Sequence, residues 1–166
     1  MVAFVIAQRS FELLIAKRNT RRLLAAGGRE HGARHYPVIV VLHVAWIASL
    51  VLFVPAVQPA RIDLLTAFFV LQLFRVWVIA SLGGRWTTRI ITLPGQPLVN
   101  RGPYRWMRHP NYVVVALEIL LLPLAFDAWR IAVIFTVLNA VILYHRIRVE
   151  NAILANTSAP NSQNHS

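Results

Sequence analysis

The polar stretch at residues 96–112, QPLVNRGPYRWMRHPNY, carries most of the side chains that could bind or react with a charged ligand. Basic and aromatic side chains are interleaved in it: Arg101, Tyr104, Arg105, Trp106, Arg108, His109 and Tyr112. The pair His109-Pro110 stands directly before an apolar run, and proline is common in the first turn of a helix. Because a helix N-terminus has unpaired N–H groups and a partial positive charge, this stretch is suited to bind a carboxylate or a phosphate.

A second pair of charged residues, Arg146 and Glu150, stands near the end of the last apolar run. A spacing of four residues places both side chains on one face of a helix. Taken alone, such a pair is typical of a solvent-exposed ion pair at a helix end, and the basic stretch is typical of a loop beside a membrane. The order of the residues, beyond their composition, favours function.

The two segments resemble the motifs of one family of integral-membrane enzymes, the isoprenylcysteine carboxyl methyltransferases. The resemblance covers roughly residues 70–154 and rests on these positions: Leu98, Val99, Gly102, Tyr104, the run Arg108-His109-Pro110-Asn111-Tyr112, Arg146 and Glu150. Two departures stand out: Gln96-Pro97 replaces a His-Thr type of pair, and Asn151 replaces the second acid of the Arg146 motif.

The resemblance implies that the enzyme uses S-adenosylmethionine. The cofactor would contact Gln96, Pro97, Leu98, Val99, Tyr104, His109, Pro110, Asn111, Tyr112 and Glu150. Arg146 would hold the methyl acceptor, and Arg146 and Glu150 would be the catalytic residues. Tyrosine rings suit adenine or a sulfonium, and a glutamate can pair with the ammonium group of the cofactor.

The implied reaction is methyl transfer to an oxygen of a lipophilic acceptor that enters from the bilayer. A carboxylate needs no base, whereas a phenol, with a pKa of about 10, must lose its proton to His145, His109 or Glu150. Residues 86–95 resemble the bacterial branch of the family, in which some members are associated with synthases of long-chain pyrones and resorcinols. The resemblance therefore implies a lipophilic acceptor such as a prenylated carboxylate or an alkylpyrone or alkylresorcinol.

Two other functions are compatible with such a sequence. A membrane reductase on a related scaffold would bind a nicotinamide cofactor. A non-catalytic membrane partner protein would tolerate substitution of Arg146 and Glu150. The residue pattern at 96–112 favours the methyltransferase.

The composition places these motifs in a membrane protein. The chain of 166 residues is 57% hydrophobic, with six acidic side chains and a mean hydropathy of +0.57, values that are typical of a polytopic membrane protein. The net charge of +11 comes from arginines between apolar runs, so no nucleic-acid partner is expected. The chain has no cysteine, and no metal site is expected.

The apolar runs predict an all-α integral membrane protein with four to five transmembrane helices. They lie at residues 2–16, 36–57, 62–82, 111–126 and 130–147, and the polar connection at 85–109 precedes the penultimate helix. The first run is shorter than the ~20 residues that a span needs, so it is either a tilted span or a surface helix. We expect one domain at residues 1–155 and a disordered tail at 156–166, which is rich in Asn and Ser.

The distribution of Lys and Arg predicts the orientation. Thirteen of them lie in segments 17–35, 83–110 and 146–166, and the opposite turns hold only Arg61 and Arg130. This bias predicts that the connection and the C-terminus lie in the cytoplasm. The resemblance to the bacterial branch implies that the membrane is a bacterial inner membrane. The N-terminus is then outside with five spans, and inside with four.

Charged residues inside the apolar runs predict a polar cluster within the membrane. At 1.5 Å per residue, His43, Arg75 and Glu118 each lie roughly 10–12 Å from the cytoplasmic end of their helices. Because an unpaired charge at that depth is costly, we expect Arg75 to pair with Glu118, with His43 as a third member. Arg9 and Glu12 are three residues apart and can form a further pair.

Overall fold

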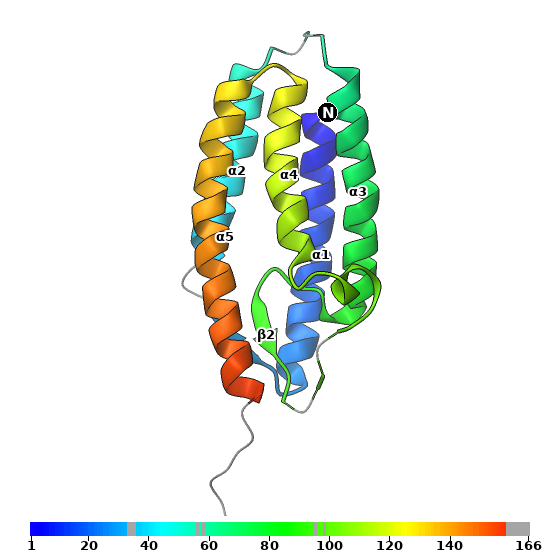
Figure 1. Cartoon of the computed structure of the whole chain (residues 1–166), viewed down its shortest axis with the longest axis vertical. Helices are drawn as coiled ribbons and strands as arrows, with labels where there is room; N and C mark the ends of the chain where they lie inside the picture. The colour runs from blue at the N-terminus through cyan, green and yellow to red at the C-terminus, as the bar shows by residue number, and fades with distance from the viewer. Residues whose placement is uncertain (33–35, 56, 58, 95, 98, 159–166) are drawn as a thin grey trace, which may run out of the picture.

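The computed structural model describes residues 1–32, 36–55, 57, 59–94, 96–97 and 99–158. Within these, five helices run lengthwise in a bundle (Figure 1). They are α1 Val2–Ala25, α2 Tyr36–Phe53, α3 Ile62–Leu82, α4 Pro110–Ala125 and α5 Trp129–Ser158. The predicted helical architecture is confirmed, and the core packs Trp46, Leu50, Phe68, Ile119 and Leu122 between the helices.

Helix ends follow local signals in most places. Gly83 ends α3 with φ at +54°, a left-handed value that favours glycine. Pro110 occupies the first turn of α4, as the sequence predicts. By contrast, α5 continues past its expected end at residue 147 to Ser158 and includes Asn156, where the tail was expected to begin. The rest of that tail lies outside the described residues.

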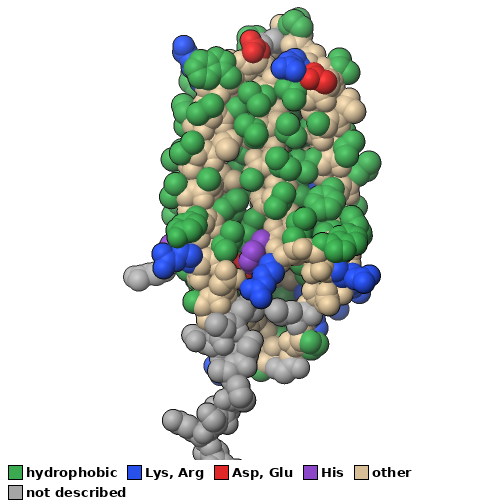
Figure 2. All heavy atoms as spheres, viewed as in Figure 1, with side chains coloured by type: hydrophobic (Ala, Val, Ile, Leu, Met, Phe, Trp, Pro, Cys, Tyr) green, Lys and Arg blue, Asp and Glu red, His purple; other side chains and the backbone are tan. Residues whose placement is uncertain are grey.

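The chain is an integral membrane protein by the length and composition of its helices. Three segments of the described chain are long and apolar enough to cross a membrane: Tyr36–Phe53, Ile62–Arg85 and Trp129–Ile153. Helix α4, with 16 residues, is a shorter apolar helix. In Figure 2 hydrophobic side chains cover the flank of the bundle, while Lys and Arg gather toward its lower end. Exposed apolar residues of the helices include Val41, Leu52, Leu73 and Val137.

Helix α1 lies lengthwise in the bundle beside the other helices (Figure 1). Its buried residues include Glu12 and Asn19, so its inward face is partly polar. Gln8 Nε2 donates a hydrogen bond of 2.7 Å to Oε1 of Gln72 on α3. The structure therefore has α1 packed against the bundle rather than lying apart on a surface.

The predicted pair of Arg75 and Glu118 forms, 3.1 Å apart, in the interior of the bundle. Helix α1 completes the cluster, because Arg75 also donates two hydrogen bonds of 2.6 Å to the Glu12 carboxylate. Arg9 pairs with Glu12 at 2.8 Å, as predicted, and also with Glu118. Two arginines and two glutamates thus balance their charges where water is scarce.

His43 does not take the predicted third place in this cluster. Its Nδ1 lies 2.8 Å from the carbonyl oxygen of Ile39, one turn earlier on its own helix α2. The physical reason is that the α1 side chains Glu12 and Arg9 occupy the remaining positions around Arg75 and Glu118.

The structure adds a small sheet that the sequence did not predict. Strand β1, Arg29–His31, pairs antiparallel with strand β2, Ile90–Thr92, with Glu30 opposite Ile91. This sheet joins the link between α1 and α2 to the polar connection between α3 and α4. Two short 3₁₀ helices, Gly83–Arg85 and Gly102–Arg105, complete that connection.

Candidate functional site

The two motifs of the sequence meet at Tyr112, in the first turn of α4. Arg146 Nε on α5 donates a hydrogen bond of 2.8 Å to the Tyr112 hydroxyl. That hydroxyl donates in turn to Glu150 Oε2, at 2.6 Å. The Arg146 guanidinium also lies over the Tyr112 ring, 5.5 Å from its centroid. Three residues from two distant segments therefore form one polar cluster at the polar end of the bundle.

His109 extends this cluster and leaves one of its own nitrogens without a partner. Its ring stacks on Tyr112, with centroids 5.1 Å apart and planes 9° apart, and its Nδ1 lies 3.6 Å from Glu150 Oε2. Within the described residues, His109 Nε2 and Asn111 Oδ1 are buried and make no hydrogen bond. Since buried polar atoms normally have partners, both atoms fit a site that a ligand completes.

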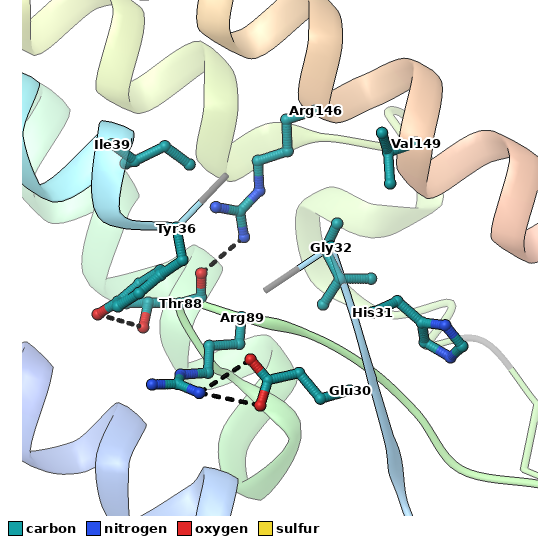
Figure 3. Close-up of a pocket in the computed structure, with 10 residues that line it drawn as sticks. Glu30, His31, Gly32, Tyr36, Ile39, Thr88, Arg89, Arg146 and Val149 are labelled. Carbon is teal, nitrogen blue, oxygen red and sulfur yellow. Dashed lines mark hydrogen bonds and ion pairs between the residues drawn. The ribbon is translucent and has the colours of Figure 1, made fainter. Parts of the chain in front are cut away.

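Arg146 also faces a narrow pocket at the polar ends of α2 and α5, which we call the Arg146 pocket (Figure 3). It has a volume of about 20 Å³ and is lined by Glu30, His31, Gly32, Tyr36, Ile39, Thr88, Arg89, Ile90, Arg146 and Val149. Arg146 Nη2 donates to the carbonyl oxygen of Thr88 at 2.7 Å. The predicted acceptor-binding residue therefore lies at the junction of this pocket and the Tyr112 cluster.

The far wall of the Arg146 pocket contains a second arginine. Arg89 Nη1 lies 2.8 and 2.9 Å from the two carboxylate oxygens of Glu30 on β1. Its guanidinium lies over the ring of Tyr36, 5.0 Å from the centroid. Thr88 Oγ1 donates to the Tyr36 hydroxyl at 3.3 Å, so strand β1, the start of α2 and the connection are held together here.

Other predicted cofactor residues lie around Arg85 rather than around Tyr112. Arg85 donates to the carbonyl oxygen of Pro97 at 2.7 Å and to the side-chain oxygen of Gln96. An open cleft of about 310 Å³ lies beside them, which we call the Arg85 cleft, lined by Leu82, Arg85, Pro97, Val99, Asn100 and Arg101. This volume is at the lower end of the range for small-molecule sites. Leu98, the remaining predicted residue of this segment, lies outside the described residues.

Tyr104 and Pro110 pack the polar connection against the helices of the bundle. Tyr104 packs against Leu71, Val78 and Val114. Burial raises the pKa of the Tyr104 phenol, and the negative charge of Glu150 adds to the shift, so this phenol stays protonated. Pro110 is fully buried at the start of α4.

Gly102 allows the 3₁₀ turn Gly102–Arg105 to lie close to α3. Gly102 has φ at +57°, and a Cβ atom there would overlap Ser81 Oγ. Arg101 Nε fixes the same turn by donating to the carbonyl oxygen of Ser81 at 2.6 Å. The glycine of the 96–112 motif is therefore required by packing.

Three residues of the site have no motif that would reveal them in the sequence. Asn19 Nδ2 on α1 donates to the carbonyl oxygens of Gly83 and Trp86, at 3.1 and 2.8 Å. Arg85 holds the segment at 96–97. Thr88 contributes a backbone carbonyl, which its residue type does not predict. Asn19 stands among basic residues in the sequence, so only the structure shows that it is buried.

Comparison with known proteins matches this sequence to a family. The model of the "Isoprenylcysteine carboxyl methyltransferase (ICMT) family" matches residues 63–156, which contain nearly all of α3, the connection, α4 and most of α5. Similar proteins include "Uncharacterized protein YpbQ" of Bacillus subtilis, 39% identical over 93% of this chain and 94% of the relative. An uncharacterized protein of Haemophilus influenzae is 25% identical over 92% of each chain. No solved structure matches.

Proposed function

This chain belongs to the isoprenylcysteine carboxyl methyltransferase family of membrane methyltransferases, and from that membership we propose that it transfers a methyl group from S-adenosylmethionine to an oxygen atom of a lipophilic acceptor. The observation that carries the proposal is the meeting of the two motifs at Tyr112, whose hydroxyl joins Arg146 to Glu150. An incidental ion pair at a helix end would not require this link to a segment 34 residues away.

The cofactor would be held by two groups of residues. His109 Nε2 and Asn111 Oδ1 are buried polar atoms without partners in the described chain, and Glu150 lies beside them with a carboxylate that suits an ammonium group. Gln96, Pro97 and Val99 border or flank the Arg85 cleft. When bound, S-adenosylmethionine supplies an electrophilic methyl group on a sulfonium centre.

Arg146 would orient the acceptor oxygen through its guanidinium, which projects into the Arg146 pocket. A carboxylate acceptor needs only this orientation. For a phenolic or enolic acceptor, one of His145, His109 and Glu150 would accept the proton. The acceptor is a prenylated carboxylate or an alkylpyrone or alkylresorcinol, and no metal and no nucleic acid takes part.

The acceptor enters from the bilayer, and the site faces the cytoplasm of a bacterial cell at the inner membrane. The apolar flank of the bundle and the thirteen Lys and Arg in the segments at its polar end support this orientation. The lengthwise position of α1 supports five spans, with the N-terminus on the opposite side of the membrane.

Calorimetry on the protein in detergent tests cofactor use. S-adenosylmethionine and its demethylated product should bind competitively, and a reduced nicotinamide cofactor should not bind. Incubation with labelled S-adenosylmethionine and a bacterial lipid extract should then label a lipid. Binding of the nicotinamide cofactor alone would favour the reductase, and binding of neither would favour the non-catalytic partner protein.

A further inference from the structure

One wall of the Arg146 pocket comes from a part of the chain that the family match does not include. Glu30 of β1 and Tyr36 and Ile39 of α2 form this wall, whereas the match covers residues 63–156. Arg146 and Val149 of α5 form the opposite wall. The motif residue Arg146 therefore faces side chains that lie outside the matched range, and differences between acceptors can be read at such a wall.

More positively charged than negatively charged side chains line the Arg146 pocket. Arg89 is paired with Glu30 through two contacts of 2.8 and 2.9 Å, so these two charges cancel. Arg146 contacts uncharged groups, the Tyr112 hydroxyl and the Thr88 carbonyl. Glu150 shares Tyr112 with Arg146 but does not line the pocket. The pocket thus offers one positive charge to a ligand.

Resting on the proposed function, we propose that the Arg146 pocket binds the head of the methyl acceptor and that Glu30, by neutralising Arg89, restricts it to heads with a single negative charge. Carboxylates, enolates and phenolates belong to this class. A phosphate head, which carries a charge of about −1.5 to −2 at pH 7, does not. Such a head would meet one available cation and the nearby Glu30 carboxylate, which repels it.

The pocket is narrow, and the contacts along its walls indicate which groups an acceptor head would meet. The volume of about 20 Å³ holds little more than one water molecule. An acidic oxygen would take the place of the Thr88 carbonyl as the partner of Arg146 Nη2. Ile39 and Val149 would contact the apolar part of the head, and its chain would follow the exposed apolar surface of α2, where Val38 and Val41 lie.

The test compares two probes of equal chain length, an alkyl carboxylate and an alkyl phosphate, with protein in nanodiscs of a zwitterionic lipid. Two readouts are used: inhibition of methyl transfer from labelled S-adenosylmethionine to a long-chain alkylresorcinol, and thermal stabilisation, which needs no turnover. The measured quantity is the preference for carboxylate over phosphate. In Glu30→Gln, this preference should fall about fivefold, the equivalent of ~1 kcal/mol for one partly exposed charge.

Two further variants and a control make the result specific. Arg89→Gln leaves Glu30 unpaired and should increase the preference for carboxylate, and the double variant Glu30→Gln/Arg89→Gln should return it to the wild-type value. Asp63→Asn removes a carboxylate from the ion pair of 2.7 Å with Arg61, outside the pocket, and should change nothing.

Each outcome has one meaning. An unchanged preference in both single variants, by both readouts, would overturn the charge selection while leaving the methyltransferase proposal intact. Equal changes in Asp63→Asn would show a general charge effect and would also overturn it. A wild-type protein that shows the predicted thermal shifts but transfers no methyl group from S-adenosylmethionine to any lipid would instead refute the proposed function.

Discussion

At the scale of single residues, Tyr112 joins the two separate motifs. Its hydroxyl accepts from Arg146 and donates to Glu150, and its ring stacks on His109. A hydroxyl can do both at once, whereas a direct ion pair would bring the two charges together and neutralise them. The tyrosine therefore keeps Arg146 and Glu150 in fixed positions while leaving each charge for a ligand.

Arg146→Ala and Glu150→Ala should each abolish methyl transfer with little loss of stability, because both side chains lie at the polar end of α5 and are only partly buried. The measurement is turnover with labelled S-adenosylmethionine together with the melting temperature. Arg148→Ala is the matched control, since Arg148 is exposed on the same helix and lies over the ring of Tyr144. Near-normal activity of either motif variant would mean that the two residues serve only the packing of α5.

Tyr112→Phe should lower kcat/KM about tenfold or more, because it removes hydrogen bonds to two charged groups, each worth about 1.5–3 kcal/mol. The ring, and its stacking on His109, would remain. Steady-state kinetics checks the expectation, and calorimetry shows whether cofactor affinity falls as well. A variant with wild-type kinetics would show that Arg146 and Glu150 do not need the bridge.

At the scale of elements, α1 positions the connection that carries both pockets. Asn19 holds the 3₁₀ turn Gly83–Arg85 through the carbonyl oxygens of Gly83 and Trp86. From this turn, Arg85 reaches the segment at 96–97. Thr88 lies two residues after Trp86, and its carbonyl oxygen accepts a hydrogen bond from Arg146. A single amide on α1 thus supports the Arg85 cleft and the Arg146 pocket together.

Asn19→Leu should raise the Kd for S-adenosylmethionine about tenfold and lower the melting temperature, because two backbone carbonyls lose their donor at about 1–3 kcal/mol in total. Calorimetry and thermal unfolding measure the two effects. Asn139→Leu is a matched control: Asn139 is also buried, on α5, but its Nδ2 has no partner among the described residues. Equal Kd values for wild type and Asn19→Leu would contradict a positioning role.

At the scale of the whole molecule, one buried charge cluster joins three helices. Arg9 and Glu12 of α1, Arg75 of α3 and Glu118 of α4 are in mutual contact, and Glu118 is only 1% exposed. Helix α1 is too polar to qualify as a membrane span by composition. The cluster stabilises α1 inside the bundle because it pairs the charged side chains of this helix. The positive and negative charges of the cluster cancel. Removing the charge of any one of its side chains therefore leaves an unpaired charge in an apolar interior.

Glu118→Gln and Arg75→Gln should therefore each lower the free energy of unfolding by about 3–5 kcal/mol. Unfolding in mixed detergent, followed by tryptophan fluorescence, measures the change. Asp63→Asn, which breaks an ion pair whose side chains are 63% and 62% exposed, should cost less than about 1 kcal/mol. If both cluster variants unfold like the wild type, the bundle does not depend on these pairs.

The proposed entry of the acceptor from the bilayer predicts a dependence on chain length. Shortening its alkyl or prenyl chain should lower activity steeply, since each buried methylene contributes about 0.8 kcal/mol. A series of resorcinols with decreasing chain length, assayed for kcat/KM, tests this expectation. Equal turnover of a chain-free, water-soluble acceptor would argue that the acceptor enters from water.

The sequence by itself determined the features that depend on local spacing. Apolar length predicted α3 at 62–82, and the Pro110 signal predicted the start of α4. Depth along the helices predicted that Arg75 meets Glu118. The order of residues at 96–112 and at Arg146 and Glu150 indicated the family, which the comparison then showed. Each of these signals lies within a short segment or follows from helix geometry.

Only the tertiary structure decided which distant segments meet. The strands of the small sheet have three residues each and no alternating pattern, so their pairing depends on where α1 ends. The contacts of Asn19 span 64 and 67 residues of sequence, and the contact of Arg146 with Thr88 spans 58. Backbone carbonyls accept in all three contacts, and every residue has one. Packing, rather than residue type, therefore selects those that shape the site.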